Sequence, residues 1–281
     1  MKNIFRFFLL NILILTSLGQ VHARSHSQVE ELIKNIKNLP TSLKIEKSSA
    51  SFLGSKTKIG PLGEGTKGRF DQDPLYSFEV FDCTTYVETV MALSLAQDLK
   101  HFKRKIVDIR YLDGIISYQR RNHFISLDWI PNNASVLSDI TSSIGDVIFA
   151  KAIIDKKNWY KKKFASKIIE QMFKSQSSSP QLAEIPYLSL KALLKGPTIL
   201  KSIPHGSIIN VVRPNWDLRD SIGTFLNVSH QGIAIWKKGK LFYRHASSFP
   251  DKTVKDTPFK EYFSKYLNSK TLKGINIQEL N

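Results

Sequence analysis

A change in residue pattern along the chain constrains its fold more than any other feature. The last third contains three short runs rich in β-branched and aromatic residues: SIINVVR, VSHQGIAIWKK and KLFYRHASS. The segment KKGK, between the second and third runs, has the residues of a hairpin turn. The first third has helical periodicity instead, and helices followed by an antiparallel sheet are typical of an α+β fold.

The first helical segment is SQVEELIKNIKNLP, which carries Val29, Ile33 and Ile36 on one side. Pro40, at the end of this segment, lies just beyond the end of that helix. The next stretch, IGPLGEGTKGRFDQDPL, is so rich in glycine, proline and charge that it predicts a long loop. This loop leads the chain to Cys83, its only cysteine.

A second helix is predicted to begin at Cys83. Residues with the spacing of one helix face follow it: Val87, Val90, Met91, Ser94 and Leu95. The residues beside the cysteine are of types that favour a helix start: Asp82, Thr84 and Thr85. Cys83 is therefore expected at or near a helix N-terminus.

The first 23 residues have the pattern of a removable export signal. Lys2 and Arg6 make a positive start, residues 7–18 are mostly apolar, and Val21-His22-Ala23 offers a cleavage site. The apolar run is shorter than a membrane span requires, so we expect a cleaved signal rather than an uncleaved anchor. Residues 24–281 are enough for a single domain with a hydrophobic core.

The chain has a formal net charge of +17. Such a charge favours anionic partners. The export signal argues against nucleic acid as that partner, whereas an anionic cell wall or membrane surface fits better. Because the lysines are scattered, as in DKKNWYKKKF, an ordinary solvated basic surface is the simpler explanation.

A single cysteine cannot form a disulfide within the chain, nor a cluster of thiolate metal ligands. Cys83 is therefore either a buried apolar filler or a reactive thiol. A helix N-terminus lowers the pKa of a thiol and offers N–H donors to an oxyanion. Its position thus supplies half of a cysteine-hydrolase site, and the other half is a histidine base held by a third polar group.

Four of the seven histidines lie outside the signal region and the lysine-rich segment at residue 101: His123, His205, His230 and His245. If Lys238-Gly239 forms a two-residue turn, His230 and His245 become diagonal neighbours on one sheet face. A three-residue loop would place them on opposite faces. The small Gly232 and Ala234 would leave room on the same face for the Cys83 helix.

Three blocks resemble, in order, the NlpC-type papain-like hydrolases of bacterial cell walls: FDCTTYVE, HGSIINVV and SHQGIAIWKKGKLFYRHAS. In this resemblance Cys83 matches the nucleophile, His230 the general base and His245 the residue that orients it. The resemblance implies a helix with the nucleophile packed on an antiparallel sheet. It implies neither a metal nor an organic cofactor.

Further blocks resemble one branch of these hydrolases, the N-acetylmuramoyl-L-alanine amidase-like proteins, formerly a domain of unknown function: FLGS, GPLGEG, RNHF, DWIPNN and INVVRPNW. This implies hydrolysis of the amide between the lactyl group of muramic acid and L-alanine. The implied substrates are muropeptides, with 1,6-anhydro ends preferred, in the periplasm of a Gram-negative bacterium. Two positions depart from the wider pattern. Ser207 replaces a frequent Asp, and Thr57 stands near a frequent Tyr beside the oxyanion.

The middle of the chain, residues 100–201, is expected to be an insertion that shapes the substrate cleft. Its run RRNHFISLDW offers groups that bind sugars and carboxylates. The candidate substrate-binding residues are Arg121, Asn122, His123, Asp128 and Trp129. An ordinary loop with one buried tryptophan is the alternative. WYKKKFASKIIEQMFK predicts a helix, and SQSSSPQ an exposed loop.

The sequence is also compatible with other functions. The same chemistry could cleave the bond between D-glutamate and the diamino acid of the stem peptide. A non-catalytic wall-binding protein would use the positive charge alone. A zinc amidase would need three well-placed ligands.

Overall fold

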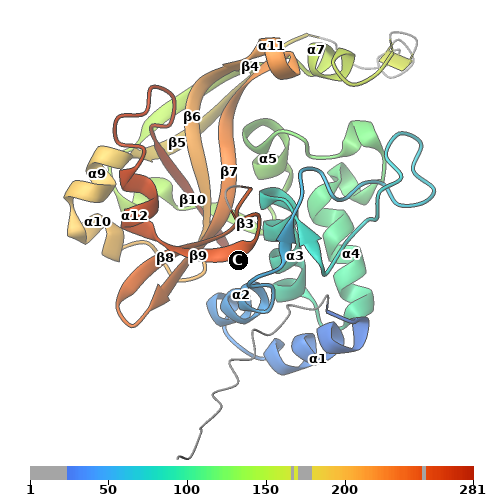
Figure 1. Cartoon of the computed structure of the whole chain (residues 1–281), viewed down its shortest axis with the longest axis horizontal. Coiled ribbons are helices and arrows are strands. Elements are labelled where there is room, and N and C mark those ends of the chain that lie inside the picture. The colour runs from blue at the N-terminus through green and yellow to red at the C-terminus, as the bar shows by residue number, and fades with distance from the viewer. Residues whose placement is uncertain (1–23, 166–167, 170–178, 249–250) are drawn as a thin grey trace, which may run out of the picture.

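The computed structural model describes residues 24–165, 168–169, 179–248 and 251–281. Helices from the first part of the chain gather on one side of the molecule, and a large sheet forms the other side (Figure 1). The helices on the first side are α1 (His26–Ile36), α2 (Thr41–Ala50), α3 (Cys83–Leu95) and α4 (Leu99–Arg110). None of the described helices has the length and apolar character to cross a membrane.

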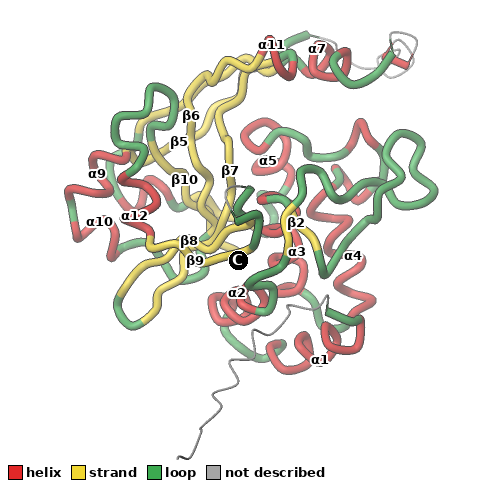
Figure 2. The backbone as a smooth tube through the Cα atoms, viewed as in Figure 1, coloured by secondary structure: helices red, strands yellow, loops and turns green. Residues whose placement is uncertain are grey.

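The large sheet is antiparallel throughout, with the strand order β4-β5-β10-β6-β7-β8-β9 and β3 paired to β10. Figure 2 shows these strands as one curved layer beside the helices. Its strands are β3 (Leu137–Asp139), β4 (Ile148–Ile154), β5 (Gln181–Ser189), β6 (Ile208–Leu218), β7 (Thr224–Lys237), β8 (Lys240–Ala246), β9 (Val254–Pro258) and β10 (Gly274–Leu280). A separate parallel pair joins β1 (Lys56–Thr57) to β2 (Val80–Phe81).

Short helical segments complete the described chain. They are α5 (Ile130–Asn132), α6 (Thr141–Ile144), α7 (Lys156–Lys161), α9 (Leu190–Lys195), α10 (Pro197–Lys201), α11 (Arg219–Ile222) and α12 (Phe259–Ser264), with 3₁₀ turns at Leu112–Gly114 and Tyr118–Arg120 and a π turn at Ile125–Trp129. Helices α9, α10 and α12 lie on the side of the sheet away from α3 (Figure 1). The sheet is therefore covered on both faces.

Alternation along the strands explains why both faces are apolar. On β7, Ile233 and Ile235 pack with α3 and its neighbours. Ala234, between them, packs instead with Phe259 and Phe263 of α12. Successive strand residues point to opposite faces, so one strand serves two cores. The predicted α+β fold, with the Cys83 helix on an antiparallel sheet, is confirmed.

The central helix α3 begins where the sequence predicts, and it is buried on more sides than the single apolar face that the sequence predicts. Asp82 caps it: Oδ1 accepts from the Thr85 N–H at 2.7 Å, and the Thr85 hydroxyl accepts from the Asp82 N–H at 2.9 Å. Every residue from Thr85 to Ser94 is buried, not only the predicted apolar face. The helix lies between the sheet and the other helices, which leaves it no solvent-facing side.

The predicted hairpin is also confirmed. Lys237 pairs with Lys240, and Ile233 with Arg244, so the loop has two residues. Both of these, Lys238 and Gly239, have positive φ, at 47° and 74°. This is the conformation of a type I′ turn, whose twist matches that of the strands it joins.

The middle of the chain contributes two strands to the main sheet. Strand β4 pairs with β5, and β5 pairs with β10, so both strands extend the sheet beyond β10. That this segment is an insertion shaping the substrate cleft stays a prediction. The predicted lysine-rich helix is represented by the short α7. Much of the rest of that segment, and most of the SQSSSPQ loop, lie in residues 166–167 and 170–178, outside the described residues.

Candidate active site

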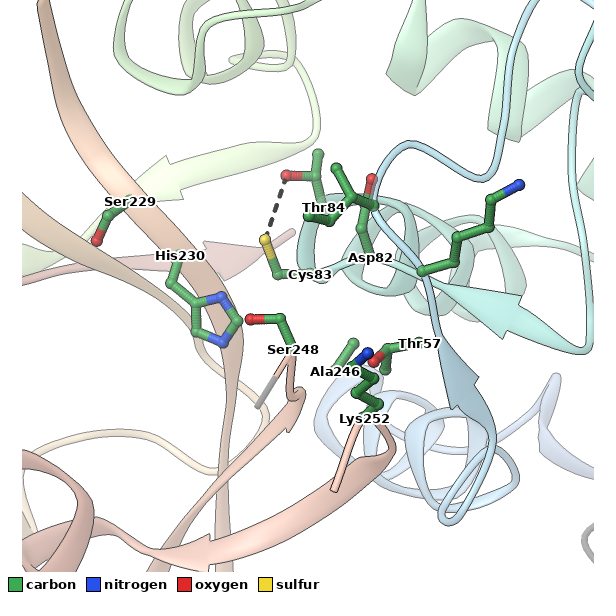
Figure 3. Close-up of a pocket in the computed structure, with 11 residues that line it drawn as sticks. Thr57, Asp82, Cys83, Thr84, Ser229, His230, Ala246, Ser248 and Lys252 are labelled. Carbon is green, nitrogen blue, oxygen red and sulfur yellow. Dashed lines mark hydrogen bonds between the residues drawn. The ribbon is translucent and has the colours of Figure 1, made fainter. Parts of the chain in front are cut away.

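Cys83 is the first residue of α3 and lies half-buried in the wall of a pocket. Its Sγ is 3.9 Å from the Thr84 Oγ1. The second carboxylate oxygen of Asp82 accepts from the Gly60 N–H at 3.2 Å, which ties the helix start to the long loop. The capped helix thus presents the thiol from a fixed backbone position (Figure 3).

His230 on β7 and His245 on β8 are joined directly. Nε2 of His230 is 2.8 Å from Nδ1 of His245, and the rings are nearly perpendicular at 88°. Nε2 of His245 in turn lies 3.3 Å from the Thr257 Oγ1 on β9. The two-residue turn sets the register that brings the histidines together, as the sequence predicts.

The pocket has a volume of about 560 Å³ and includes both Cys83 and His230. His245 is only 3% exposed and lies behind His230. Figure 3 shows one ring nitrogen of His230 on the side of Cys83 and the other turned away. The residues that line the pocket are Thr57, Lys58, Ile59, Asp82, Cys83, Thr84, Ser229, His230, Ala246, Ser248 and Lys252.

Burial, with the negative charge of Asp82, raises the pKa of the Cys83 thiol to about 11. Hydrogen bonds from the backbone of Gln231 and Thr84 oppose this increase in pKa but are weaker. Burial and the charge of the capping carboxylate thus act against the low thiol pKa that a helix start favours.

The two histidines are also neutral at physiological pH. Burial lowers the pKa of His230 to about 4. Burial and then the neighbouring His230 lower the pKa of His245 to about 3. A neutral ring carries one N–H, so two hydrogen-bond chains are compatible with the geometry. If His230 donates to His245, and His245 to Thr257, then Nδ1 of His230 keeps a lone pair and can act as a base.

Tyr243 is a residue of this site that the sequence reasoning missed. Its ring stacks on His245 with a centroid distance of 4.7 Å and an interplanar angle of 16°. Gly232 makes this possible, because a Cβ there would lie 2.5 Å from the tyrosine ring. The predicted hairpin register already places position 243 two residues before His245 on the same face, which is the signal that could have identified it.

The expected substrate-binding residues do not line this pocket. Trp129 is fully buried in the core and Asn122 is 5% exposed, so neither side chain presents a surface to a ligand in this structure. The Asn122 Nδ2 donates to the Ile109 carbonyl at 2.9 Å, and its Oδ1 accepts from Asn132 at 2.7 Å. The hydrogen bonds of Asn122 hold the loop in place.

The other three candidates also have partners within the protein. The Arg121 Nη1 donates to the Leu62 carbonyl at 2.8 Å and to Asp71 at 3.1 Å. His123 Nε2 is 2.8 Å from the Tyr118 carbonyl, and burial lowers the pKa of this histidine. Asp128 pairs with Lys156. Their role in binding substrate stays a prediction.

Thr57 lines the pocket near the place where the resemblance puts an oxyanion donor. Its hydroxyl donates to the Ser247 carbonyl at 2.6 Å, so it is already engaged. The N–H of Cys83, at the first position of α3, has no intrahelical acceptor and is the better placed donor. In the part of the chain that the structure describes, no three His, Cys, Asp or Glu side chains group as metal ligands.

Comparison with known proteins connects this geometry to a family. The family model of the N-acetylmuramoyl-L-alanine amidase-like (AmiA-like) proteins matches residues 47–271. The solved structure of protein LPG0564 from Legionella pneumophila, of family DUF1460, is similar with a TM-score of 0.83. The two are 36% identical, and the match covers 91% of this chain and 94% of that one.

An N-acetylmuramoyl-L-alanine amidase from Bacteroides uniformis has the same fold, with a TM-score of 0.66 and 24% identity over 86% of this chain and 99% of its own. None of the curated proteins matches the chain. The family model covers most of the sequence, and the Legionella protein matches over nearly its whole length. This chain therefore belongs to the N-acetylmuramoyl-L-alanine amidase-like family.

Proposed function

We propose that this protein is a cysteine amidase that hydrolyses the bond between the lactyl group of N-acetylmuramic acid and L-alanine. The observation that carries the proposal is the pocket shared by Cys83, at the start of α3, and His230, which bonds His245 at 2.8 Å. A thiol, an imidazole base and a group that orients the base are the parts of a thiol acyl-transfer site.

The first half of the reaction breaks the amide. The Cys83 sulfur attacks the lactyl carbonyl carbon while its proton moves to Nδ1 of His230. The carbonyl oxygen becomes an oxyanion that accepts from backbone N–H groups at the start of α3. The oxyanion then collapses, the C–N bond breaks, and His230 returns the proton to the nitrogen of L-alanine. A thioester and a free peptide amine result.

The second half releases the sugar. His230 takes a proton from water, whose oxygen attacks the thioester carbon, and the C–S bond breaks as the proton returns to sulfur. Because the pKa of the free thiol is about 11, attack and proton transfer are expected to be concerted rather than to start from a stable thiolate. His245 and Thr257 keep the His230 ring in its reactive orientation.

The substrates in this proposal are soluble peptidoglycan fragments, with 1,6-anhydro sugar ends preferred. The membership of the family supports a cell-wall substrate. The signal pattern in residues 1–23 and the net charge of +17 support export to the periplasm, where anionic wall material is present. N-terminal sequencing of exported protein is expected to begin at Arg24.

The test is digestion of a defined anhydromuramyl tripeptide followed by mass analysis. The expected products are the free anhydro sugar acid and a peptide that begins with L-alanine. Release of the sugar still joined to L-alanine and D-glutamate would assign the other bond of the stem peptide instead. If neither bond is cleaved at high enzyme concentration, the proposal fails.

A further inference from the structure

Arg213 on β6 is a guanidinium that lies partly inside the protein without a carboxylate partner among the described residues. Its Nε donates to the Ser229 Oγ at 3.0 Å, and its Nη1 donates to the Thr271 hydroxyl. Its central carbon lies 4.8 Å from the centre of the Trp216 ring. All of these partners are neutral, and no described residue accepts a hydrogen bond from Nη2.

Three other arginines that are buried or half-buried each have a carboxylate partner. Arg110 bonds Glu88 at 2.7 Å, and Arg244 bonds Asp256 at 2.7 Å. Arg121 bonds Asp71 at 3.1 Å. A buried or half-buried cation is normally balanced in this way, because desolvation disfavours an unpaired charge. Arg213 is the exception among these inner arginines, and burial lowers its pKa accordingly.

Arg213 is connected to the catalytic residues from two directions. Arg213 lies beyond the residues that line the pocket, but Ser229, which bonds its Nε, does line it and precedes His230. On the other side, Tyr266 and Tyr262 both act on the pKa of Arg213, partly offsetting the effect of burial, and the Tyr262 ring is 5.1 Å from that of His245. Tyr266 continues this aromatic wall, with its ring 5.6 Å from that of Tyr262.

We propose that Arg213, with Trp216, Tyr262 and Tyr266, forms a subsite that binds a carboxylate of the peptide part of the substrate. A guanidinium with free N–H groups matches a carboxylate in geometry and charge, and the aromatic rings provide apolar contact beside it. This inference rests on the proposed function. In an anhydromuramyl peptide the lactyl carboxyl is consumed in the amide, so a free carboxylate must come from the stem peptide.

The subsite therefore contributes to specificity for the leaving group rather than for the sugar. When the diamino acid is lysine, the stem tripeptide has two chemically similar carboxylates, that of D-glutamate and the terminal one of lysine. The experiment uses three anhydromuramyl tripeptides of this type: one with both carboxylates free, one amidated on D-glutamate and one amidated at the terminal carboxyl. Values of kcat and KM are measured for wild type, Arg213→Gln and the control Arg104→Gln, which alters an exposed arginine on α4.

For wild type, amidation of the recognised carboxylate is expected to raise KM about tenfold to a hundredfold, with little change in kcat. Arg213→Gln is expected to raise KM for the unmodified peptide by a similar factor and to lose the discrimination. Arg104→Gln should behave as wild type. The carboxylate whose amidation raises the wild-type KM as much as Arg213→Gln does is the one that Arg213 binds.

Two results would overturn the subsite. In the first, Arg213→Gln lowers activity equally on all three peptides, which is the effect of a purely structural residue. In the second, wild type cleaves all three equally well. Failure of the proposed function looks different, because no peptide is then cleaved at the lactyl bond. Binding of the three peptides to Cys83→Ala protein, measured by calorimetry, still reports on Arg213 in that case.

Discussion

Nε2 of His230 lies 2.8 Å from Nδ1 of His245, on the neighbouring strand of the same hairpin. Each histidine limits what the other can do. His245 fixes the ring of His230 with one nitrogen and contacts Thr257 with the other, which leaves a single nitrogen of His230 for chemistry. In the proposed reaction the pair acts as one base, and the hairpin sets the direction of its free nitrogen.

Cys83→Ala is expected to abolish turnover and leave the fold intact. The side chain is small, so its removal takes away the nucleophile with little loss of packing. We expect a decrease in kcat of at least about a thousandfold. Circular dichroism and thermal unfolding of the variant provide the control. Activity within tenfold of wild type would rule out Cys83 as the nucleophile.

His230→Ala is expected to reduce kcat about a hundredfold to ten-thousandfold, because it removes the proton acceptor. His245→Gln should cost less, since glutamine can still accept a hydrogen bond from His230. Both are measured on the same muropeptide at neutral pH. If His245→Gln is inactive while His230→Ala keeps its activity, the two roles are exchanged.

Alkylation of Cys83 by iodoacetamide is expected to be slow at pH 7 and to accelerate as the pH rises toward about 11, because the thiol pKa is about 11 in the unliganded site. Turnover should already be high at pH 7, since His230 removes the proton during attack. Rates of alkylation and residual activity are measured together across pH. Fast alkylation near neutrality would instead reveal a preformed thiolate.

Stability is expected to fall as the pH drops from about 6.5 to about 4. Burial lowers the pKa of His230 to about 4, so in this window the unfolded chain binds more protons than the folded one. The free energy of unfolding therefore decreases on acidification, by about 1 to 3 kcal/mol for one such histidine. Urea unfolding at several pH values tests this, and His230→Gln should show a smaller decrease. Equal slopes for both proteins would contradict it.

Gly232→Ala is expected to destabilise the protein by about 1 to 3 kcal/mol through overpacking. The new methyl group would lie 2.5 Å from the Tyr243 ring and 2.8 Å from the Arg244 carbonyl. Because Tyr243 stacks on His245, we also expect lower kcat. Gly145→Ala is the matched control, since its nearest contact is an ordinary 3.5 Å. Thermal unfolding and kinetics of both variants test whether stability and kcat fall in Gly232→Ala alone.

Local sequence signals predicted the parts of the site that depend on short-range structure. The helix start at Cys83 follows from the capping residues beside it, and the hairpin follows from Lys238-Gly239. The burial of Trp129 and Asn122 could not be predicted from such local signals. Polar and aromatic residues in one run are equally typical of a binding loop and of a buried turn, and only the packing around them separates the two cases.

The pairing of strands that are distant in the chain likewise could not be predicted from the sequence. The segment IFAKAII, which forms β4, is apolar almost throughout and has no clear strand period, and β5 contains Pro186. Thr257 joins the site only because β9 pairs with β8, which places it opposite Tyr243. The thiol pKa depends in the same way on burial that assembles from distant segments.

The position of β10 has a consequence for the order of folding. This strand comes last in the chain, yet in the sheet it lies between β5 and β6. Until residues 274–280 are available, β4-β5 and β6-β9 are two separate pieces with unpaired inner edges. The sheet that orients His230 and His245 is therefore completed only after the whole domain has been synthesised, and slow folding dominated by distant contacts is expected.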